Sequence, residues 1–124
     1  MYKPFHLIGL ELSISVFNAA LRAESTGTAR EWRGDVVAVA KRALKSGETL
    51  DGEGGYTVYG KLVPVARSLT EGALSIGLAH GVRLTRDVAA GTIVRMNDVL
   101  LDQGSIALKL RREMVGKPGI ISAT

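Results

Sequence analysis

The sequence contains no cysteine and only two histidines, His6 and His80. The lack of cysteine excludes thiol catalysis, disulfides and thiolate metal sites. Two histidines are too few for a zinc site built from histidine alone, so we expect no metal site. The absence of cysteine also fits a cytoplasmic location.

Aromatic residues make up only 5% of the sequence, although the net charge is +4 and the pI is about 9.7. The basic residues are dispersed, and the densest pairs are Lys41-Arg42 and Arg111-Arg112. No aromatic residues are interleaved with these pairs, as they would be in proteins that bind single strands. We therefore expect a solvated basic surface and no nucleic-acid partner.

The chain also lacks a long apolar run. Residues 1–23, MYKPFHLIGLELSISVFNAALRA, have the outline of a secretory signal, but His6, Glu11 and Asn18 interrupt the apolar stretch. This stretch is too short and too polar to span a membrane. We expect neither a membrane anchor nor a cleaved signal.

The 124 residues are 46% hydrophobic and 23% charged, which is typical of one globular domain. Apolar residues spaced by three or four predict an amphipathic helix over residues 7–22; they are Ile8, Leu12, Val16, Ala19 and Ala23. Residues 25–28 read as a loop.

Residues 36–44 (VVAVAKRAL), 56–66 (YTVYGKLVPVA), 81–88 and 92–101 have the composition of strands. Residues 68–74 read as a short helical turn. A short C-terminal helix is expected after a cap at Asp102 or Ser105, with Ile106, Leu110 and Met114 spaced by four. The predicted fold is mainly β with flanking helices, that is, α+β.

An internal repeat accounts for two of the glycines. KRALKSGETL (41–50) aligns with TRDVAAGTIV (85–94), so that Gly47 lies over Gly91 and Leu44 over Val88. We interpret Gly47 and Gly91 as turn glycines that take positive φ.

The glycine-rich segment 51–60, DGEGGYTVYG, has neither the G-x-G-x-x-G nor the G-x-x-x-x-G-K-[ST] pattern of nucleotide loops. Asp51 and Glu53 would also repel phosphate. We interpret Gly54 and Gly55 as turn residues and expect no cofactor to bind this chain.

The segment VRLTRDVAAGTIVRMNDV, residues 82–99, resembles the SAF domain, also called antifreeze-like. The resemblance implies a β-clip fold. SAF domains occur in sialic-acid synthases, sugar-acid dehydratases and proteins that assemble flagella and pili.

A wider resemblance covers KPFHLIGLELSISVFNAAL, WRGDVVAVAKRALKSGETLDGEGGYTVYGKL and ALSIGLAHGVRLTRDVAAGTIVRMNDV. These segments are similar to the C-terminal part of homoserine-dehydrogenase-like and deoxyxylulose-phosphate-reductoisomerase-like oxidoreductases. The resemblance implies three regions: residues 1–30 as a helical remnant of a catalytic domain with a linker, residues 31–103 as the SAF domain, and residues 104–124 as a helix and tail.

The resemblance implies NAD(P) as the cofactor of the parent enzymes, but their Rossmann domain has no counterpart in this sequence. We therefore expect a non-catalytic region that covers the substrate site or aids subunit association. The expected partners are the missing catalytic domain or further copies of the chain. The alternative is a free-standing SAF binding protein, either an exported appendage-assembly chaperone or a sugar-acid-binding accessory subunit.

Lys3, His6 and Glu11 are the candidate substrate-binding residues, since a lysine and a histidine near a helix start can bind a phosphate or carboxylate. A solvated lysine and a locally hydrogen-bonded histidine are the alternative. Trp32 and Tyr56 are expected in the core, with an interface role as the alternative. No complete catalytic set is expected.

Overall fold

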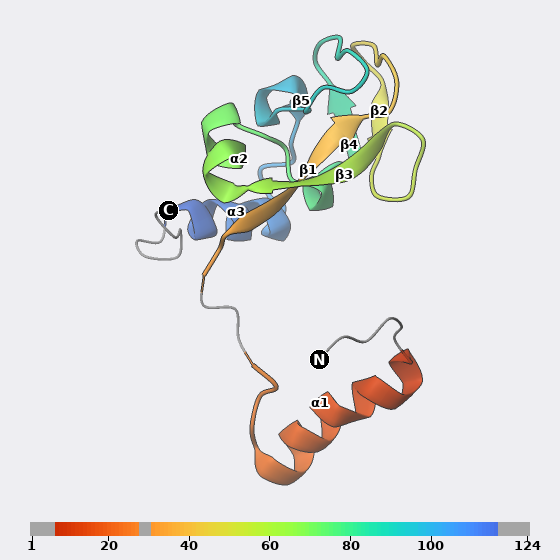
Figure 1. Ribbon diagram of the computed structural model, residues 1–124. Helices are drawn as coiled ribbons and strands as arrows, with labels where there is room; N and C mark the ends of the chain where they lie inside the picture. The colour runs from red at the N-terminus through yellow and green to blue at the C-terminus, as the bar shows by residue number, and fades with distance from the viewer. Residues whose placement is uncertain (1–6, 28–30, 117–124) are drawn as a thin grey trace. The chain divides into compact units, whose positions relative to one another are not determined.

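The computed structural model describes residues 7–27 and 31–116, which belong to two compact units, residues 1–30 and 31–124 (Figure 1). Lys3 and His6 lie outside the described residues.

The first unit contains one helix, α1 (Ile8–Arg22), as the apolar spacing predicted. Its last turn carries Arg22, a cation that suits the negative end of the helix dipole. The helix stops at Ala23, which takes a left-handed conformation with φ 51°, and the backbone N–H groups of Ala23 and Glu24 donate to the Asn18 carbonyl. None of the helices in the described parts of the chain is long and apolar enough to cross a membrane.

The centre of the second unit is an antiparallel pair of strands, β1 (Gly34–Ala40) and β3 (Val58–Pro64). Both faces are covered along the second half of β1, where Val37 to Ala40 are buried. Ala38, Ala40 and Val58 belong to one apolar cluster, and Val37 and Val39 belong to another on the opposite face. Burial on both faces explains why β1 is a continuous apolar run instead of an alternating one.

Three further strands form a second antiparallel sheet in the order β2 (Thr49–Asp51), β4 (His80–Leu84) and β5 (Val99–Leu100). Two helices complete the unit: α2 (Val65–Glu71) and α3 (Ile106–Gly116). Two short 3₁₀ segments, η1 (Ile76–Leu78) and η2 (Met96–Asp98), precede β4 and β5. The prediction of an α+β fold with helices before and after the strands is confirmed.

Hydrogen bonds confirm the internal repeat. Leu44 and Val88 exchange both backbone hydrogen bonds, at 2.8 and 2.9 Å. The Gly47 N–H donates to the Leu84 carbonyl. In the same way the N–H of Gly91, the counterpart of Gly47, donates to the carbonyl of Ala40, the counterpart of Leu84. Both glycines have positive φ, 87° and 74°. The two halves of the repeat are therefore related by an approximate two-fold axis. We call the contact between them, centred on Leu44 and Val88, the clasp.

Several predicted boundaries were wrong. The first strand ends at Ala40, and the helical turn predicted over residues 68–74 is α2, which starts directly after Pro64 and ends at Glu71, with Gly72 as its C-cap. Residues 92–101 are not one strand. Isolated bridges at Ile93 and Arg95 are followed by η2. The chain folds back there because the Asp98 carboxylate accepts the Arg95 N–H at 2.8 Å.

Candidate functional site

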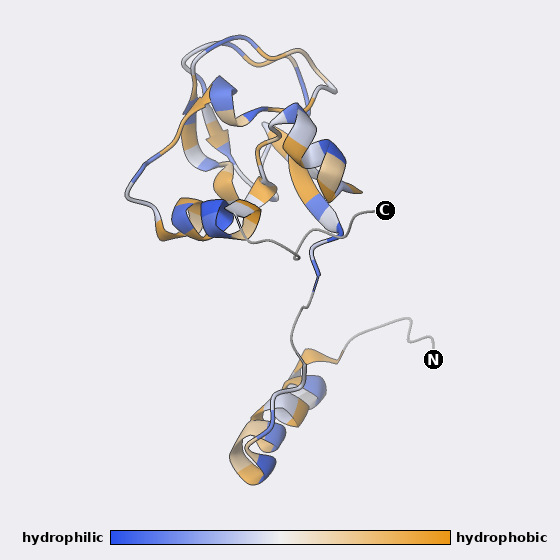
Figure 2. Ribbon diagram, turned by 90° about the vertical axis from the view of Figure 1, so that its left-hand side faces the viewer, coloured by the Kyte–Doolittle hydropathy of each residue, from blue (hydrophilic) through white to orange (hydrophobic). Residues whose placement is uncertain are grey.

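Four of the five polar residues of α1 lie in one narrow stripe, and the fifth, Ser13, lies on another side of the helix. Glu11, Ser15, Asn18 and Arg22 follow one another at spacings of four, three and four, which places them on one side of the helix. Glu11, a predicted site residue, accepts the Leu7 N–H at 3.5 Å and belongs to this stripe. The rest of the circumference is largely apolar, and Figure 2 shows apolar residues along the length of α1.

The apolar part of α1 is not covered within its own unit. The large exposed side chains, with their exposed fractions, are Ile8 (75%), Leu12 (64%), Ile14 (58%), Val16 (55%), Phe17 (58%) and Leu21 (79%). A helix that is apolar around most of its circumference normally lies inside a larger protein assembly. This helix is therefore the first candidate for an interaction surface.

A buried polar network in the second unit joins β1, α2 and α3. The Arg111 Nη2 lies 2.5 Å from the Asp35 Oδ2, and the Ser68 hydroxyl donates to the same oxygen at 2.5 Å. The Arg111 guanidinium also stacks on Trp32, 4.3 Å from the ring centroid. Asp35 is 6% exposed and Ser68 is 2% exposed, so the network is shielded from water.

A hollow of about 370 Å³ adjoins this network. Its lining includes Trp32, Leu78, Leu110, Arg111 and Met114, so it is bounded mostly by carbon with one guanidinium at its edge. The hollow lies between η1 and α3. Its chemistry suits an apolar side chain better than a polar metabolite.

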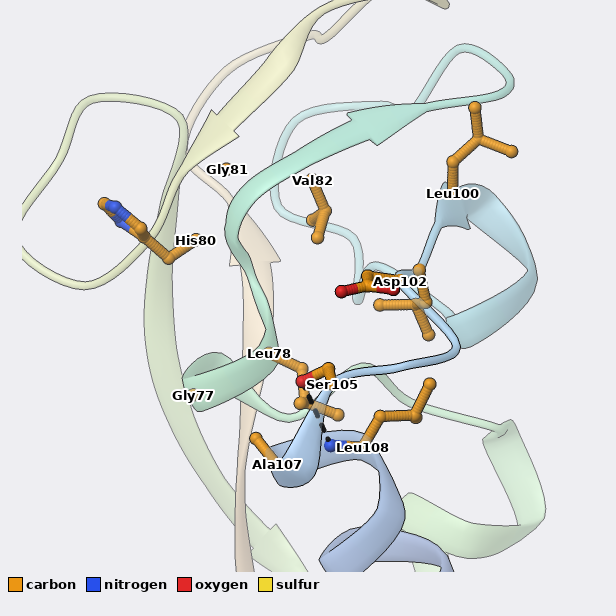
Figure 3. A pocket seen from close by; sticks show the side chains of 11 residues that line it. Gly77, Leu78, His80, Gly81, Val82, Leu100, Asp102, Ser105, Ala107 and Leu108 are labelled. Carbon is orange, nitrogen blue, oxygen red and sulfur yellow. Dashed lines mark hydrogen bonds between the residues drawn. The ribbon is translucent and has the colours of Figure 1, made fainter.

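A second hollow, of about 310 Å³, lies at the start of α3 and is shown in Figure 3. Its polar lining includes Asp102 and Ser105, and the Ser105 hydroxyl accepts the Leu108 N–H at 3.5 Å. Figure 3 shows the His80 ring directed away from these two residues. The His80 Nδ1 lies instead 3.0 Å from the carbonyl oxygen of Asp51. His80 therefore has a structural partner in β2 rather than a catalytic one in this hollow.

A third hollow, of about 360 Å³, lies beside the ion pair between Arg86 and the buried Asp98. Because Asp98 also accepts the Arg95 N–H, its carboxylate is used to hold the turn.

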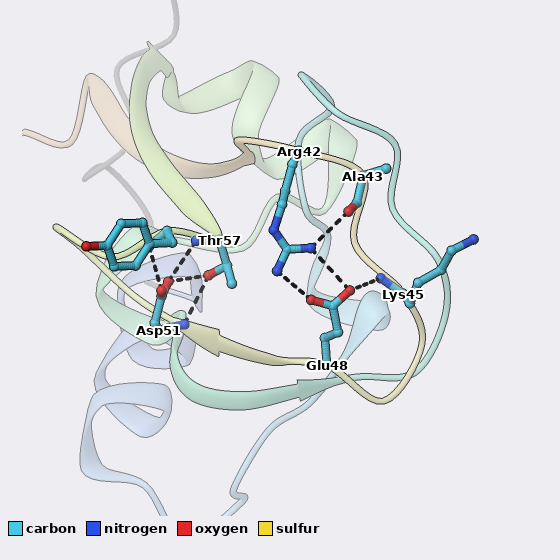
Figure 4. A network of polar contacts seen from close by, with 7 residues as sticks. Arg42, Ala43, Lys45, Glu48, Asp51 and Thr57 are labelled. Atoms are coloured by element: carbon cyan, nitrogen blue, oxygen red, sulfur yellow. Dashed lines mark hydrogen bonds and ion pairs between the residues drawn. The ribbon is translucent and has the colours of Figure 1, made fainter.

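The charged residues of the turn after β1 pair with one another (Figure 4). Arg42 and Glu48 form an ion pair at 2.7 Å, and Glu48 also accepts the Lys45 N–H at 2.6 Å. These hydrogen bonds, that from Arg42 foremost, lower the pKa of Glu48. Lys45 in turn contacts Asp87 at 2.7 Å, which links the two repeats and lowers the pKa of Asp87.

Asp51 organises the glycine-rich loop. Its carboxylate accepts the Thr57 hydroxyl and the backbone N–H groups of Tyr56 and Thr57, as Figure 4 shows in part. The Thr57 hydroxyl is the largest cause of the low pKa of Asp51, about 2. A Cβ at Gly55 would collide with this carboxylate, so the glycine permits the close approach.

The sequence-predicted residues are thus not brought together by the described structure. Glu11 lies on α1 in the first unit. Tyr56 is 87% exposed, so the prediction that it lies in the core is wrong. The loop turns its side chain outward while the Asp51 carboxylate accepts its backbone N–H. Trp32 is buried, at 8% exposure, as predicted.

Sequence reasoning missed Asp35, Ser68 and Arg111 altogether. Asp35 directly precedes an apolar strand and Arg111 lies in a basic pair, and neither local pattern indicates a contact across 76 positions. Among residues 7–27 and 31–116, no three or more histidine or acidic side chains form a group that could hold a metal ion. The described residues offer two candidate binding surfaces, the exposed apolar side chains of α1 and the apolar hollow between η1 and α3.

The family model described as SAF domain matches residues 35–100, just over half of the chain. No curated protein matches the chain. The match starts at Asp35 and ends at β5, so α1, Trp32 and α3 lie outside it. The ion pair between Asp35 and Arg111 therefore fastens α3 to the SAF domain.

Proposed function

The chain belongs to the SAF domain family, and we propose that it is the non-catalytic SAF region of a homoserine-dehydrogenase-like NAD(P)-dependent oxidoreductase. In this role it associates with the Rossmann and catalytic domains and helps to cover the substrate site or to join subunits. Cofactor binding and chemistry belong to those domains.

The observation that carries the proposal is the surface of α1. Four of its five polar residues occupy one stripe, and the large apolar residues around the remaining circumference are between 55% and 79% exposed within the unit, from Val16 at the low end to Leu21 at the high end. A helix with this distribution is stabilised when a larger apolar surface covers it. In the resembled oxidoreductases the corresponding segment is the last piece of the catalytic domain.

The polar chemistry of the second unit supports a binding role over a catalytic one. Asp35, Glu48, Asp51, Asp87 and Asp98 each accept hydrogen bonds from side chains or backbone groups that hold the fold. A general base needs a carboxylate that faces a substrate. These carboxylates face the protein's own turns and helices instead.

The test is a binding measurement with separately expressed Rossmann and catalytic domains of a homoserine-dehydrogenase-like enzyme encoded in the same genome. We expect calorimetry to detect a complex between these domains and the chain. We also expect that the chain alone does not bind NADPH. Micromolar binding of NADPH by the chain alone would contradict the proposed division of labour.

Two α1 variants make the measurement specific. Leu12→Glu combined with Phe17→Glu places charges on two sides of the apolar surface, and we expect it to abolish the complex. Asn18→Glu lies in the polar stripe, four residues before Arg22, and should leave the complex intact. Equal binding by both variants would show that α1 is not the contact, and the proposal would fail.

A further inference from the structure

Helix α3 has two apolar faces, and only one of them is used. Leu108 is 1% exposed and packs against the domain, where Arg111 fastens the helix to Asp35. On another side, Ile106, Leu110 and Met114 form a row spaced by four, with exposed fractions of 75%, 54% and 38%. These are the three residues whose spacing predicted this helix.

The row borders the hollow of about 370 Å³ beside Trp32. Leu110 and Met114 belong to the lining of this hollow, whereas Ile106 lies one helical turn before Leu110 and outside it. The surface thus combines a protruding apolar side chain, Ile106, with an apolar recess next to Met114. A surface that carries both a knob and a recess is suited to pairing with itself.

We propose that α3 packs antiparallel against α3 of a second copy of this chain, about a two-fold axis that passes near Leu110. In this arrangement Leu110 meets Leu110 of the second copy. Ile106 of each copy lies opposite Met114 of the other and enters the recess beside it. The interface is isologous, so the same residues are used on both sides.

The charges beside the row select the antiparallel direction. Lys109 and Glu113 lie on one flank of the row, and neither has an ion-pair partner among the described residues. An antiparallel pair sets this flank against the same flank of the second copy, so that Lys109 of each copy meets Glu113 of the other. A parallel pair would set the flank against the side that carries Ala107 and Arg111, and Arg111 is already paired with the buried Asp35.

This surface differs from the one in the proposed function, which uses α1, so the two can fail separately. A contact made by one helix and one recess per copy is small, and we expect a weak dimer that depends on concentration. Sedimentation velocity of the full chain from about 1 µM to about 1 mM should show a monomer converting to a dimer.

Leu110→Glu places two carboxylates against each other at the axis and should eliminate the dimer over this range. The matched control is Leu62→Glu on β3, because Leu62 is also an exposed leucine, at 72%, and is not among the residues that line the hollow beside α3. We expect the control to dimerise as the unaltered chain does. A dimer that persists in Leu110→Glu, or a chain that remains monomeric at every concentration, would overturn the proposal.

Charge exchange tests the direction. Lys109→Glu alone and Glu113→Lys alone should each weaken the dimer by like-charge repulsion, and an equimolar mixture of the two variants should form a heterodimer. Because the chain has no cysteine, Leu110→Cys introduces a single thiol, which should form a disulfide between copies under mild oxidant. Failure of the mixture to associate, or a Leu62→Cys control that cross-links equally well, would refute the antiparallel contact.

Discussion

The buried ion pair between Arg111 and Asp35 gives the most quantitative prediction. In Arg111→Met the cation is lost, and Asp35, which is 6% exposed, retains only the Ser68 hydrogen bond among its described partners. Removing one partner of a buried pair costs about 3–5 kcal/mol, because the other charge is left uncompensated. The stacking on Trp32, worth about 0.5–2 kcal/mol, is lost as well.

A loss of about 3–5 kcal/mol is a large fraction of the total stability of a small domain, which is about 5–15 kcal/mol. Urea unfolding followed by fluorescence should measure it directly, since Trp32 is the single tryptophan of the chain and lies against Arg111. Far-UV circular dichroism on the same samples reports the helices. Protein concentration must be held constant, because association would add to the apparent stability.

Two variants separate the ion pair from general effects of substitution. Arg112→Met removes the neighbouring, exposed arginine, whose partner among the described residues is Gln103, and should cost less than about 1 kcal/mol. Asp35→Leu combined with Arg111→Met removes both charges and should recover much of the stability lost in the single variant. The reasoning is refuted if Arg111→Met unfolds at the same urea concentration as the unaltered chain, or if the double variant is less stable than the single one.

Three further predictions concern the SAF domain itself. The folded-state pKa of Asp51 is about 2 against an ordinary 3.8, so its stabilising contribution is complete above about pH 4 and is lost as the pH falls toward 2. In calorimetry, Asp51→Asn should lower the melting temperature at pH 7 and flatten the fall of the melting temperature between pH 4 and pH 2. An unchanged slope would argue against this role of Asp51. Gly91→Ala should lower the free energy of unfolding in urea by about 1–2 kcal/mol, because φ at Gly91 is 74°. Gly77 has open space around it and no positive φ, so Gly77→Ala should change the free energy of unfolding by less than about 0.5 kcal/mol. Equal effects would show that backbone strain is not the cause. Leu44→Ala, at a side chain only 1% exposed, should cost about 2–5 kcal/mol, and a cost below about 1 kcal/mol would mean that the clasp between the repeats is not part of the core.

Periodicity and composition predicted much of the secondary structure. The spacing of apolar residues located α1 to within a residue, and the run VVAVA located the strand that is buried on both faces. The internal repeat predicted that Leu44 and Val88 are equivalent, and they face each other across the clasp. These features depend on residues that are close in sequence, or on a pattern that occurs twice, so they can be recognised without the fold.

Sequence patterns are therefore enough to predict the class of fold, the two halves of the clasp and the apolar rows of the flanking helices. Which face of α3 is buried depends on contacts between residues that are far apart in the sequence. Ile106, Leu110 and Met114 have the spacing of a core stripe, yet the contact between Arg111 and Asp35 turns the helix so that Leu108 faces the domain instead. Local periodicity indicates that a face of a helix is apolar, but it does not indicate which part of the chain covers that face. The orientation of α3 depends on Asp35, which lies 76 positions before Arg111 and comes into contact with it only when the chain folds.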